Sequence, residues 1–324
     1  MNKLKIGVMG CANIAIRTVI PTLQKHDDFD VVSIASRSAS KATETAAKFG
    51  CEAVIGYDAL LADDSLDAIY MPLPTGLHEE WVLKSLNAGK HILVEKSLAM
   101  THGSAKIMVA HAQKKNLLIM ENFMFLYHSQ HKAIAKMIAD DAIGEIRAFR
   151  SSFGFPPLDE DNFRYDKALG GGALLDAAAY TIRASQLYLG LDLSVQGAHL
   201  DRPNPDGVDI YGGAFLKNKT GQFSQVAFGF DNFYQCNYEI WGSKGKITAN
   251  KAFTPKPDET PKIVIERQGF RDEIALPADN HFINILTEFR RCIQAGNFAD
   301  KYIEIINQSR LLQEVRDASN VAVV

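Results

Sequence analysis

Residues 4–15 read Leu-Lys-Ile-Gly-Val-Met-Gly-Cys-Ala-Asn-Ile-Ala, which predicts a buried strand that turns at Gly10 into a helix. This order matches the dinucleotide-binding fingerprint G-x-G-x-x-G/A, with Ala15 where the helix meets the strand. Alanine replaces the middle glycine, so an ordinary tight turn is the alternative. If a dinucleotide binds, we expect its phosphates at the backbone of Gly10, Cys11, Ala12, Asn13 and Ile14, where the helix begins.

Outward from this turn, apolar runs alternate with helical segments. The runs are residues 29–35, 53–55, 68–71, 91–94 and 117–120. Strands separated by helices predict a parallel sheet. After about residue 122, hairpin-sized strands joined by turns at 218–221 and 242–245 predict an antiparallel sheet instead. We therefore expect an α/β protein: a doubly wound Rossmann domain over residues 1–121, and an α+β domain with an open, mostly antiparallel sheet over 122–324.

Composition narrows the possible partners. Of the 324 residues, 47% are hydrophobic and 23% charged, which is typical of a globular protein. The net charge of −3 does not suit a protein that binds nucleic acid or an anionic membrane surface. No apolar run reaches the length of about 18 residues that predicts a membrane span, and the first residues do not resemble a signal peptide. We therefore expect a cytoplasmic protein. The four cysteines lack metal-ligand spacing, so we also expect reduced thiols and no metal site.

The second predicted strand ends in Ser36-Arg37, where an acidic side chain would receive the ribose hydroxyls of NAD. No acid is present, and a hydroxyl with a guanidinium suits a 2′-phosphate instead. We therefore predict that NADP(H) is preferred over NAD(H). A solvated loop arginine is the alternative.

The predicted strand 91–94 runs into Glu95-Lys96-Ser97, at the edge where parallel sheets bind ligands. A partly buried ammonium needs a partner or a task, although a strand-end lysine can also reach solvent. With four other segments, this one resembles the glucose-fructose oxidoreductase / inositol dehydrogenase / rhizopine catabolism (Gfo/Idh/MocA) family. The five segments, in order over most of the chain, are 7–15, 35–37, 71–78, 89–96 and 170–176.

The resemblance implies hydride transfer between a nicotinamide cofactor and a sugar, polyol or related carbonyl compound. It also implies a homodimer or homotetramer built through the C-terminal sheet. By the same resemblance, Lys96 is the catalytic-site lysine, and the loop with Leu73, Pro74 and His78 passes beside the nicotinamide ribose. The resemblance adds Glu95, Asn122 and Arg164 as expected cofactor contacts, with a surface position as the alternative for Arg164.

Two positions depart from the commonest pattern of the family. Ser97 replaces the proline that follows the lysine, where the bond is often cis. A cis bond before serine costs about 3–4 kcal/mol, so we expect a trans or visibly strained Lys96–Ser97 peptide. The second departure is a tyrosine, Tyr180, where many relatives have a histidine that donates or accepts the proton.

Asp176 and Tyr180 are four residues apart, which places them on one face of a helix. Carbonyl reduction needs an acid for the oxygen. A tyrosine is a stronger acid when a nearby ammonium lowers its pKa. We therefore expect Tyr180 as acid and base, Lys96 as its assistant, and Asp176 to hold Lys96 or the substrate hydroxyls. A core tyrosine on an alanine-lined helix is the alternative.

The resemblance favours an NADP(H)-dependent oxidoreductase that acts on CH–OH groups and interconverts a sugar hydroxyl and a keto group. An NADP-dependent aldose 1-dehydrogenase or a dihydrodiol dehydrogenase is the enzymatic alternative. A nicotinamide-binding regulator is the non-enzymatic one, and a glycosidase with tightly held NAD is a third. The resemblance implies that the specificity side chains lie on the C-terminal sheet and its loops, where no transferable code identifies the substrate.

Overall fold

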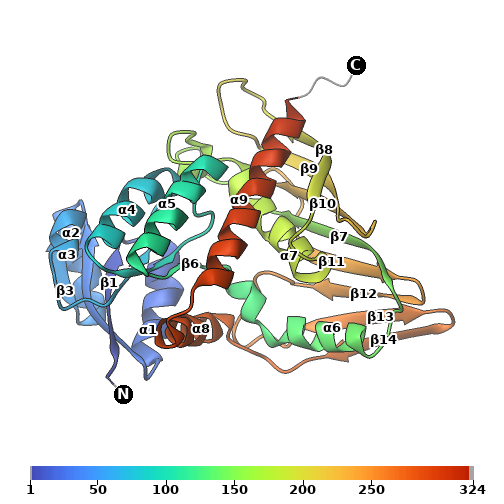
Figure 1. Cartoon of the computed structure of the whole chain (residues 1–324), viewed down its shortest axis with the longest axis horizontal. Coiled ribbons are helices and arrows are strands. Elements are labelled where there is room, and N and C mark those ends of the chain that lie inside the picture. Colours follow the sequence, from blue (N-terminus) through green and yellow to red (C-terminus); the bar gives the residue numbers. More distant parts are fainter. Residues whose placement is uncertain (1, 321–324) are drawn as a thin grey trace. The chain divides into compact units, whose positions relative to one another are not determined.

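The apolar runs of the N-terminal part form a six-stranded parallel sheet in a computed structural model that describes residues 2–320 (Figure 1). The strands are β1 (Leu4–Met9), β2 (Phe29–Ser36), β3 (Glu52–Ile55), β4 (Ala68–Met71), β5 (His91–Val94) and β6 (Ile119–Glu121), and they lie in the order β3-β2-β1-β4-β5-β6. The chain passes from β1 to β3 on one side and returns past β1 for the other three. Doubly wound sheets bind ligands at this reversal, beyond the carboxyl ends of β1 and β4.

Helices connect these strands. They are a π-helix (Ala15–Val19) continued by α1 (Ile20–Lys25), then α2 (Ala39–Phe49), α3 (Tyr57–Leu61), α4 (His78–Asn87) and α5 (His102–Lys115). Ser38 caps α2 by accepting a hydrogen bond from the backbone of Lys41, and Gly50, with φ +66°, ends that helix. Within residues 2–320, no helix has the length and apolar character needed to span a membrane.

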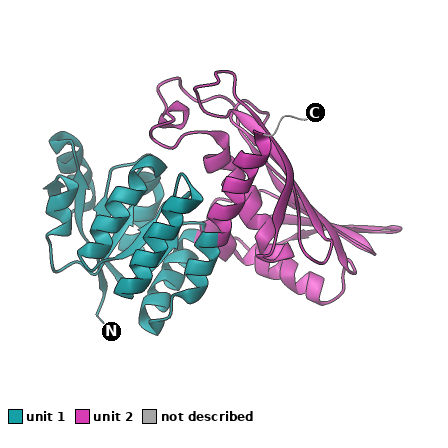
Figure 2. Cartoon of the chain, turned by 45° about the horizontal axis from the view of Figure 1, so that its top comes forward, with its two compact units in different colours: residues 1–123, 282–306 teal, residues 124–281, 307–324 magenta. Residues whose placement is uncertain are grey.

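The contacts divide the chain into two compact units (Figure 2). The first runs to Phe123 and also contains Phe282–Ile306, most of α8 (His281–Ala295) and the start of α9 (Ala299–Ser319). The expected division near residue 121 did not include this late segment. Tertiary contacts explain the difference: Arg290 donates to the carbonyl of Asn2 (3.0 Å), and the Tyr302 hydroxyl donates to the carbonyl of Leu117 (2.7 Å).

The second unit contains an eight-stranded sheet in the order β14-β13-β12-β11-β7-β10-β9-β8. Its strands are β7 (Ile146–Gly154), β8 (Ser194–Asp201), β9 (Tyr211–Lys217), β10 (Phe223–Gly229), β11 (Gln235–Gly242), β12 (Gly245–Asn250), β13 (Lys262–Arg267) and β14 (Phe270–Ala275). All neighbours pair antiparallel except β7 and β10, which are parallel. The predicted fold class is confirmed in both units.

One face of this sheet is buried. Along β11, Cys236, Tyr238 and Ile240 are buried, and the residues between them are more exposed. Helices α6 (Ser129–Ala139) and α7 (Ala179–Leu189) lie along the buried face (Figure 2). Helix α7, which carries Tyr180, therefore packs against the buried face of the sheet.

A hydrogen-bonded chain of polar side chains crosses this core. Tyr188 donates to the Tyr238 hydroxyl (2.6 Å), which donates to Nδ1 of His131 (2.7 Å). The other ring nitrogen of His131 donates to the carbonyl of Ala252 (3.1 Å), which fixes the neutral tautomer. Burial lowers the pKa of His131 to about 3, and the neighbouring His128 and His281 add to the effect.

This network predicts acid sensitivity. The unfolded chain binds a proton at His131 near pH 6.5 and the folded chain only near pH 3, so the free energy of unfolding should fall as pH drops between those values. The slope is at most about 1.4 kcal/mol per pH unit for one histidine. His131→Gln removes this titration, so its denaturant midpoint should fall less than wild type between pH 7 and pH 5. An equal fall in both proteins would contradict the assignment.

Candidate functional site

The first unit has a hollow of about 270 Å³ where the loops after β1, β2 and β4 meet. It is lined by Gly10, Cys11, Ala12, Ser36, Arg37, Ser38, Lys41, Tyr57, Pro72, Leu73, Pro74 and Leu77. Gly10 turns the chain with φ +121°, and a Cβ atom there would lie 3.0 Å from the Leu73 side chain. The positive φ favours glycine at this turn, and the missing side chain leaves space where a dinucleotide phosphate would bind.

Most of the residues predicted from the glycine turn and the second strand line this hollow. Asn13 and Ile14 belong to the same turn but do not line it. Lys41 and Tyr57 were not predicted to line the hollow, although their positions after β2 and β3 could have indicated it. Lys41 lies in the first turn of the helix after β2, and Tyr57 follows β3, the neighbour of β2.

The β2 end of the hollow suits an anion. Arg37 and Lys41 supply two cations, and none of the described residues that line the hollow is acidic. The Ser36 hydroxyl accepts a hydrogen bond from the backbone of Ser38 (3.2 Å), which holds the strand-to-helix turn in shape. A hydroxyl, a guanidinium and an ammonium together fit a 2′-phosphate better than a pair of ribose hydroxyls.

Lys96 follows β5 and is partly exposed. The Lys96–Ser97 peptide is cis, so the trans expectation was wrong. The preference of a peptide bond before serine for the trans form is overridden, because tertiary contacts hold the residues that follow Lys96. The carbonyl oxygen of Ser97 lies 3.1 Å from Nδ1 of His78, and the Leu98 N–H donates to the Glu121 carboxylate (2.7 Å).

Three residues expected to touch the cofactor, His78, Asn122 and Glu95, make hydrogen bonds within the protein. His78 is fully buried, and its ring nitrogens lie 2.8 Å from Leu73 O and 3.1 Å from Ser97 O. Burial lowers the pKa of His78, so the ring is neutral. Asn122, 1% exposed, donates to the Glu95 carboxylate (2.6 Å).

Glu95 also accepts a hydrogen bond from the Tyr70 hydroxyl (2.8 Å). Burial raises the pKa of Glu95, although both donors and the adjacent Lys96 oppose the shift. These bonds anchor the backbone that carries Lys96. The Glu95 carboxylate is therefore hydrogen-bonded to two side chains of the protein.

Asp176 and Tyr180 lie on one continuous helix of the second unit, but not on a regular α-helix. Residues Leu174–Ala178 form a π-helix and α7 begins at Ala179. π-Helical turns are rare and occur often at functional sites. Arg164, expected at the cofactor, forms an ion pair with Asp176 (Nε to Oδ2, 2.7 Å). Asp176 is thus held by Arg164 within this unit.

The Tyr180 ring is 7% exposed and packs among three phenylalanines. Ring centroids lie 5.0 Å from Phe153 and 5.7 Å from both Phe125 and Phe253. Such a surround fixes the ring and hence the direction of the hydroxyl. The ring is therefore packed as a core tyrosine is, as the alternative expected.

Asp209 supports this helix and was not predicted to do so. Its carboxylate accepts from the backbone N–H of Leu174 (2.6 Å), at the start of the π-helix. A side chain at Gly172, where φ is +107°, would lie 2.6 Å from the same carboxylate. The glycine run therefore lets Asp209 cap the helix that carries Asp176 and Tyr180.

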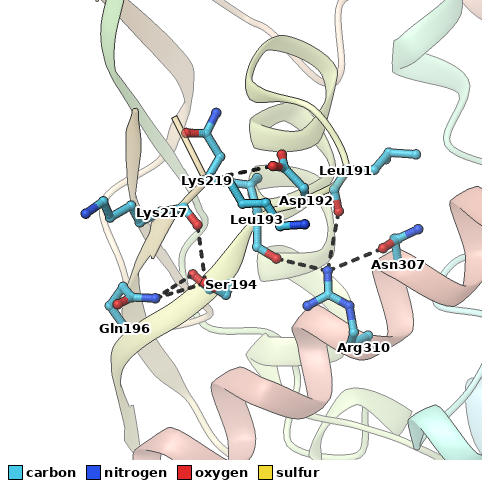
Figure 3. Close-up of a pocket in the computed structure, with 10 residues that line it drawn as sticks. Leu191, Asp192, Leu193, Ser194, Gln196, Lys217, Lys219, Asn307 and Arg310 are labelled. Carbon is cyan, nitrogen blue, oxygen red and sulfur yellow. Dashed lines mark hydrogen bonds between the residues drawn. The ribbon is translucent and has the colours of Figure 1, made fainter. Parts of the chain in front are cut away.

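A larger hollow of about 540 Å³ lies in the second unit, beside α9 (Figure 3). Arg310 points into the loop before β8 and donates to the carbonyls of Leu191 (3.4 Å) and Leu193 (2.9 Å). None of the predicted site residues lines it. Because loop carbonyls already occupy the guanidinium, we place the candidate site elsewhere.

Comparison with known proteins identifies relatives of both units. The model of the oxidoreductase family with an NAD-binding Rossmann fold matches residues 4–123, and the GFO/IDH/MocA C-terminal domain matches residues 131–248. The chain is 42% identical to dTDP-3,4-didehydro-2,6-dideoxy-alpha-D-glucose 3-reductase of Saccharopolyspora spinosa, over 92% of this chain and 90% of that protein. It is 30% identical to D-xylose 1-dehydrogenase (NADP(+)) 2 of Haloferax volcanii, over 90% of each.

Among solved structures, the chain resembles KijD10, a 3-ketoreductase from Actinomadura kijaniata in complex with NADP and TDP-benzene. The TM-score is 0.95, with 40% identity over 98% of both chains. KijD10 variants with a lysine replaced by alanine or glutamate, or a tyrosine by phenylalanine, have been crystallised with the same ligands. With its parallel-sheet unit, its glycine turn and both family domains matched in order, the chain belongs to the Gfo/Idh/MocA family of oxidoreductases.

Proposed function

We propose that the protein is an NADPH-dependent reductase of a keto group on a nucleotide-linked deoxysugar. One correspondence carries the proposal. The lysine and the tyrosine replaced in the KijD10 variants are 84 positions apart, as are Lys96 and Tyr180. With 40% identity over nearly the whole of both chains, this equal spacing supports Lys96 and Tyr180 as the matching pair.

The cofactor part of the proposal rests on the hollow of the first unit. Gly10, Cys11 and Ala12 would receive the phosphates that join the two nucleotides. Arg37, with Lys41, would receive the 2′-phosphate. The crystallised relative KijD10 holds NADP, in agreement with this preference.

When bound, NADPH supplies the hydride for the carbonyl carbon. The residues of this chain donate the proton and stabilise the developing charge. The Tyr180 hydroxyl donates its proton to the carbonyl oxygen of the substrate. In the reverse direction the Tyr180 phenolate takes a proton from the hydroxyl group of the sugar. The Lys96 ammonium favours the phenolate and orients the oxygen. Arg164 holds Asp176 through an ion pair, and the Asp176 carboxylate would receive the substrate hydroxyls.

We further propose a cytoplasmic homodimer or homotetramer that associates through the outer face of the β7–β14 sheet. Large apolar side chains are exposed on this sheet: Tyr211 is 43%, Phe215 38% and Trp241 49% exposed. The Arg150 guanidinium lies 5.2 Å from the Trp241 ring centroid. Aromatic and arginine side chains together are typical of interfaces between subunits.

A direct assay separates the candidate activities. NADPH should be oxidised in the presence of a dTDP-linked 3-keto-deoxysugar, with kcat/KM at least about tenfold higher than with the same keto-sugar lacking the nucleotide. NADH should be the weaker cofactor. Oxidation of xylose with NADP⁺ and no turnover of the keto-sugar would favour an aldose 1-dehydrogenase, the activity named for the Haloferax volcanii relative. Binding of NADPH without any turnover would favour a regulator.

A further inference from the structure

The exposed side chain of Arg37 has a buried partner in the same hollow. The Tyr57 side chain lines this hollow together with Arg37, and the guanidinium partly offsets the rise that burial gives the pKa of the Tyr57 hydroxyl. Tyr57 is 6% exposed. The glycine-rich fingerprint and the rule about the end of the second strand both omit this residue.

Sheet register brings these two residues together. β2 and β3 are parallel, with Ser36 opposite Ile55. One residue further, the backbone of Gly56 donates to Ser36 O (2.9 Å). Gly56 adopts φ +86° and turns the chain into α3, which begins at Tyr57. The turn therefore delivers Tyr57 beside Arg37.

The Tyr57 ring is fixed from behind. It meets the Trp81 ring edge to face, with centroids 5.0 Å apart and an interplanar angle of 84°. The Lys84 ammonium lies 4.1 Å from the Trp81 ring centroid, and Lys84 is paired with Asp58 at 3.1 Å. Burial raises the pKa of Tyr57, which keeps its hydroxyl neutral.

We propose that Tyr57 is a positioning residue for the choice of NADP(H) over NAD(H). It holds the Arg37 guanidinium where it meets the 2′-phosphate. An exposed arginine samples many rotamers, and fixing one of them lowers the entropy lost on binding. The guanidinium has five N–H donors, so one hydrogen bond to the Tyr57 hydroxyl would leave enough for bidentate contact with a phosphate. The proposal rests on the proposed function, because it requires NADP(H) as the cofactor.

Titration of the full-length protein with NADPH and NADH tests this role. Tyr57→Phe keeps the ring against Trp81 and removes only the hydroxyl. The Kd for NADPH should rise roughly 3- to 10-fold, and the Kd for NADH should change less than about twofold. Arg37→Ala should raise the Kd for NADPH more than Tyr57→Phe does. Adding Tyr57→Phe to Arg37→Ala should then have no further effect, because the two residues act as one unit.

Tyr302→Phe is the matched control, since it removes a buried hydroxyl from the same unit, one that donates to Leu117 O outside the hollow. It should leave the ratio of the two Kd values unchanged. If Tyr57→Phe weakens both cofactors equally, or neither, the positioning role is overturned while the cofactor assignment stands. If wild type does not prefer NADPH, or Arg37→Ala does not change the ratio, the cofactor part of the proposed function fails and this inference fails with it.

Discussion

Replacing Tyr180 with phenylalanine should lower the turnover number roughly 10²- to 10⁴-fold, the range expected when a general acid is removed. The Kd for NADPH should stay within about twofold of wild type, because the cofactor hollow lies in the other unit. Phenylalanine fits the surround of Phe125, Phe153 and Phe253, so the fold should be retained. Steady-state kinetics with the keto-sugar and a cofactor titration provide the two readouts.

Tyr188→Phe is the matched control for this variant. Tyr188 lies on the same helix, and its hydroxyl donates to Tyr238 rather than to a ligand. This substitution should lower stability slightly and leave turnover near wild type. Unchanged turnover in Tyr180→Phe, or an equal loss in both variants, would remove the acid-base role from Tyr180.

Replacing Lys96 with methionine should also depress turnover roughly 10²- to 10⁴-fold, with NADPH binding largely retained. Methionine is of similar length but has no charge, so the carbonyl loses its orienting cation and Tyr180 loses the charge that favours its phenolate. The apparent pKa of the catalytic acid in the pH profile of kcat should therefore rise in this variant.

The exposed lysine of α5, Lys106, provides the control for charge removal. Lys106→Met should change neither turnover nor the pH profile. A Lys96→Met enzyme that turns over like wild type would contradict the catalytic role. A loss of turnover without a shift of the pH profile would leave Lys96 a role in orientation and none in the tyrosine pKa.

Sequence patterning predicted the first sheet well because most of its strands are buried on both faces and read as apolar runs, although the edge strand β3 has no buried residue. The edge strands β8 and β14 were missed. Phe270–Ala275 has no fully buried residue, and Ser194–Asp201 has one. A strand with so little burial carries no clear two-residue period. The return of residues 282–306 to the first unit was also missed, since an amphipathic helix shows that it has a buried face but not which sheet covers it.

The residues of the candidate site also differed in how well the sequence predicted them. Residues placed by strand ends, such as Gly10 and Arg37, were predicted because topology alone brings those ends together. His78 and Asn122 were assigned to the cofactor, and the structure shows both buried and bonded to the protein. Their orientation depends on side-chain packing, which has no signature in a single sequence. Tyr57 was missed for the same reason.

Isotope transfer tests the central claim most directly. The protein would be incubated with NADPH that carries deuterium at the transferable position of the nicotinamide, together with a dTDP-linked 3-keto-deoxysugar, and the product analysed by mass spectrometry and NMR. The account predicts one deuterium on the former carbonyl carbon of the wild-type product, and little product from the Tyr180→Phe enzyme in the same time. A product without deuterium, or no reduction of any nucleotide-linked keto-sugar, would contradict it.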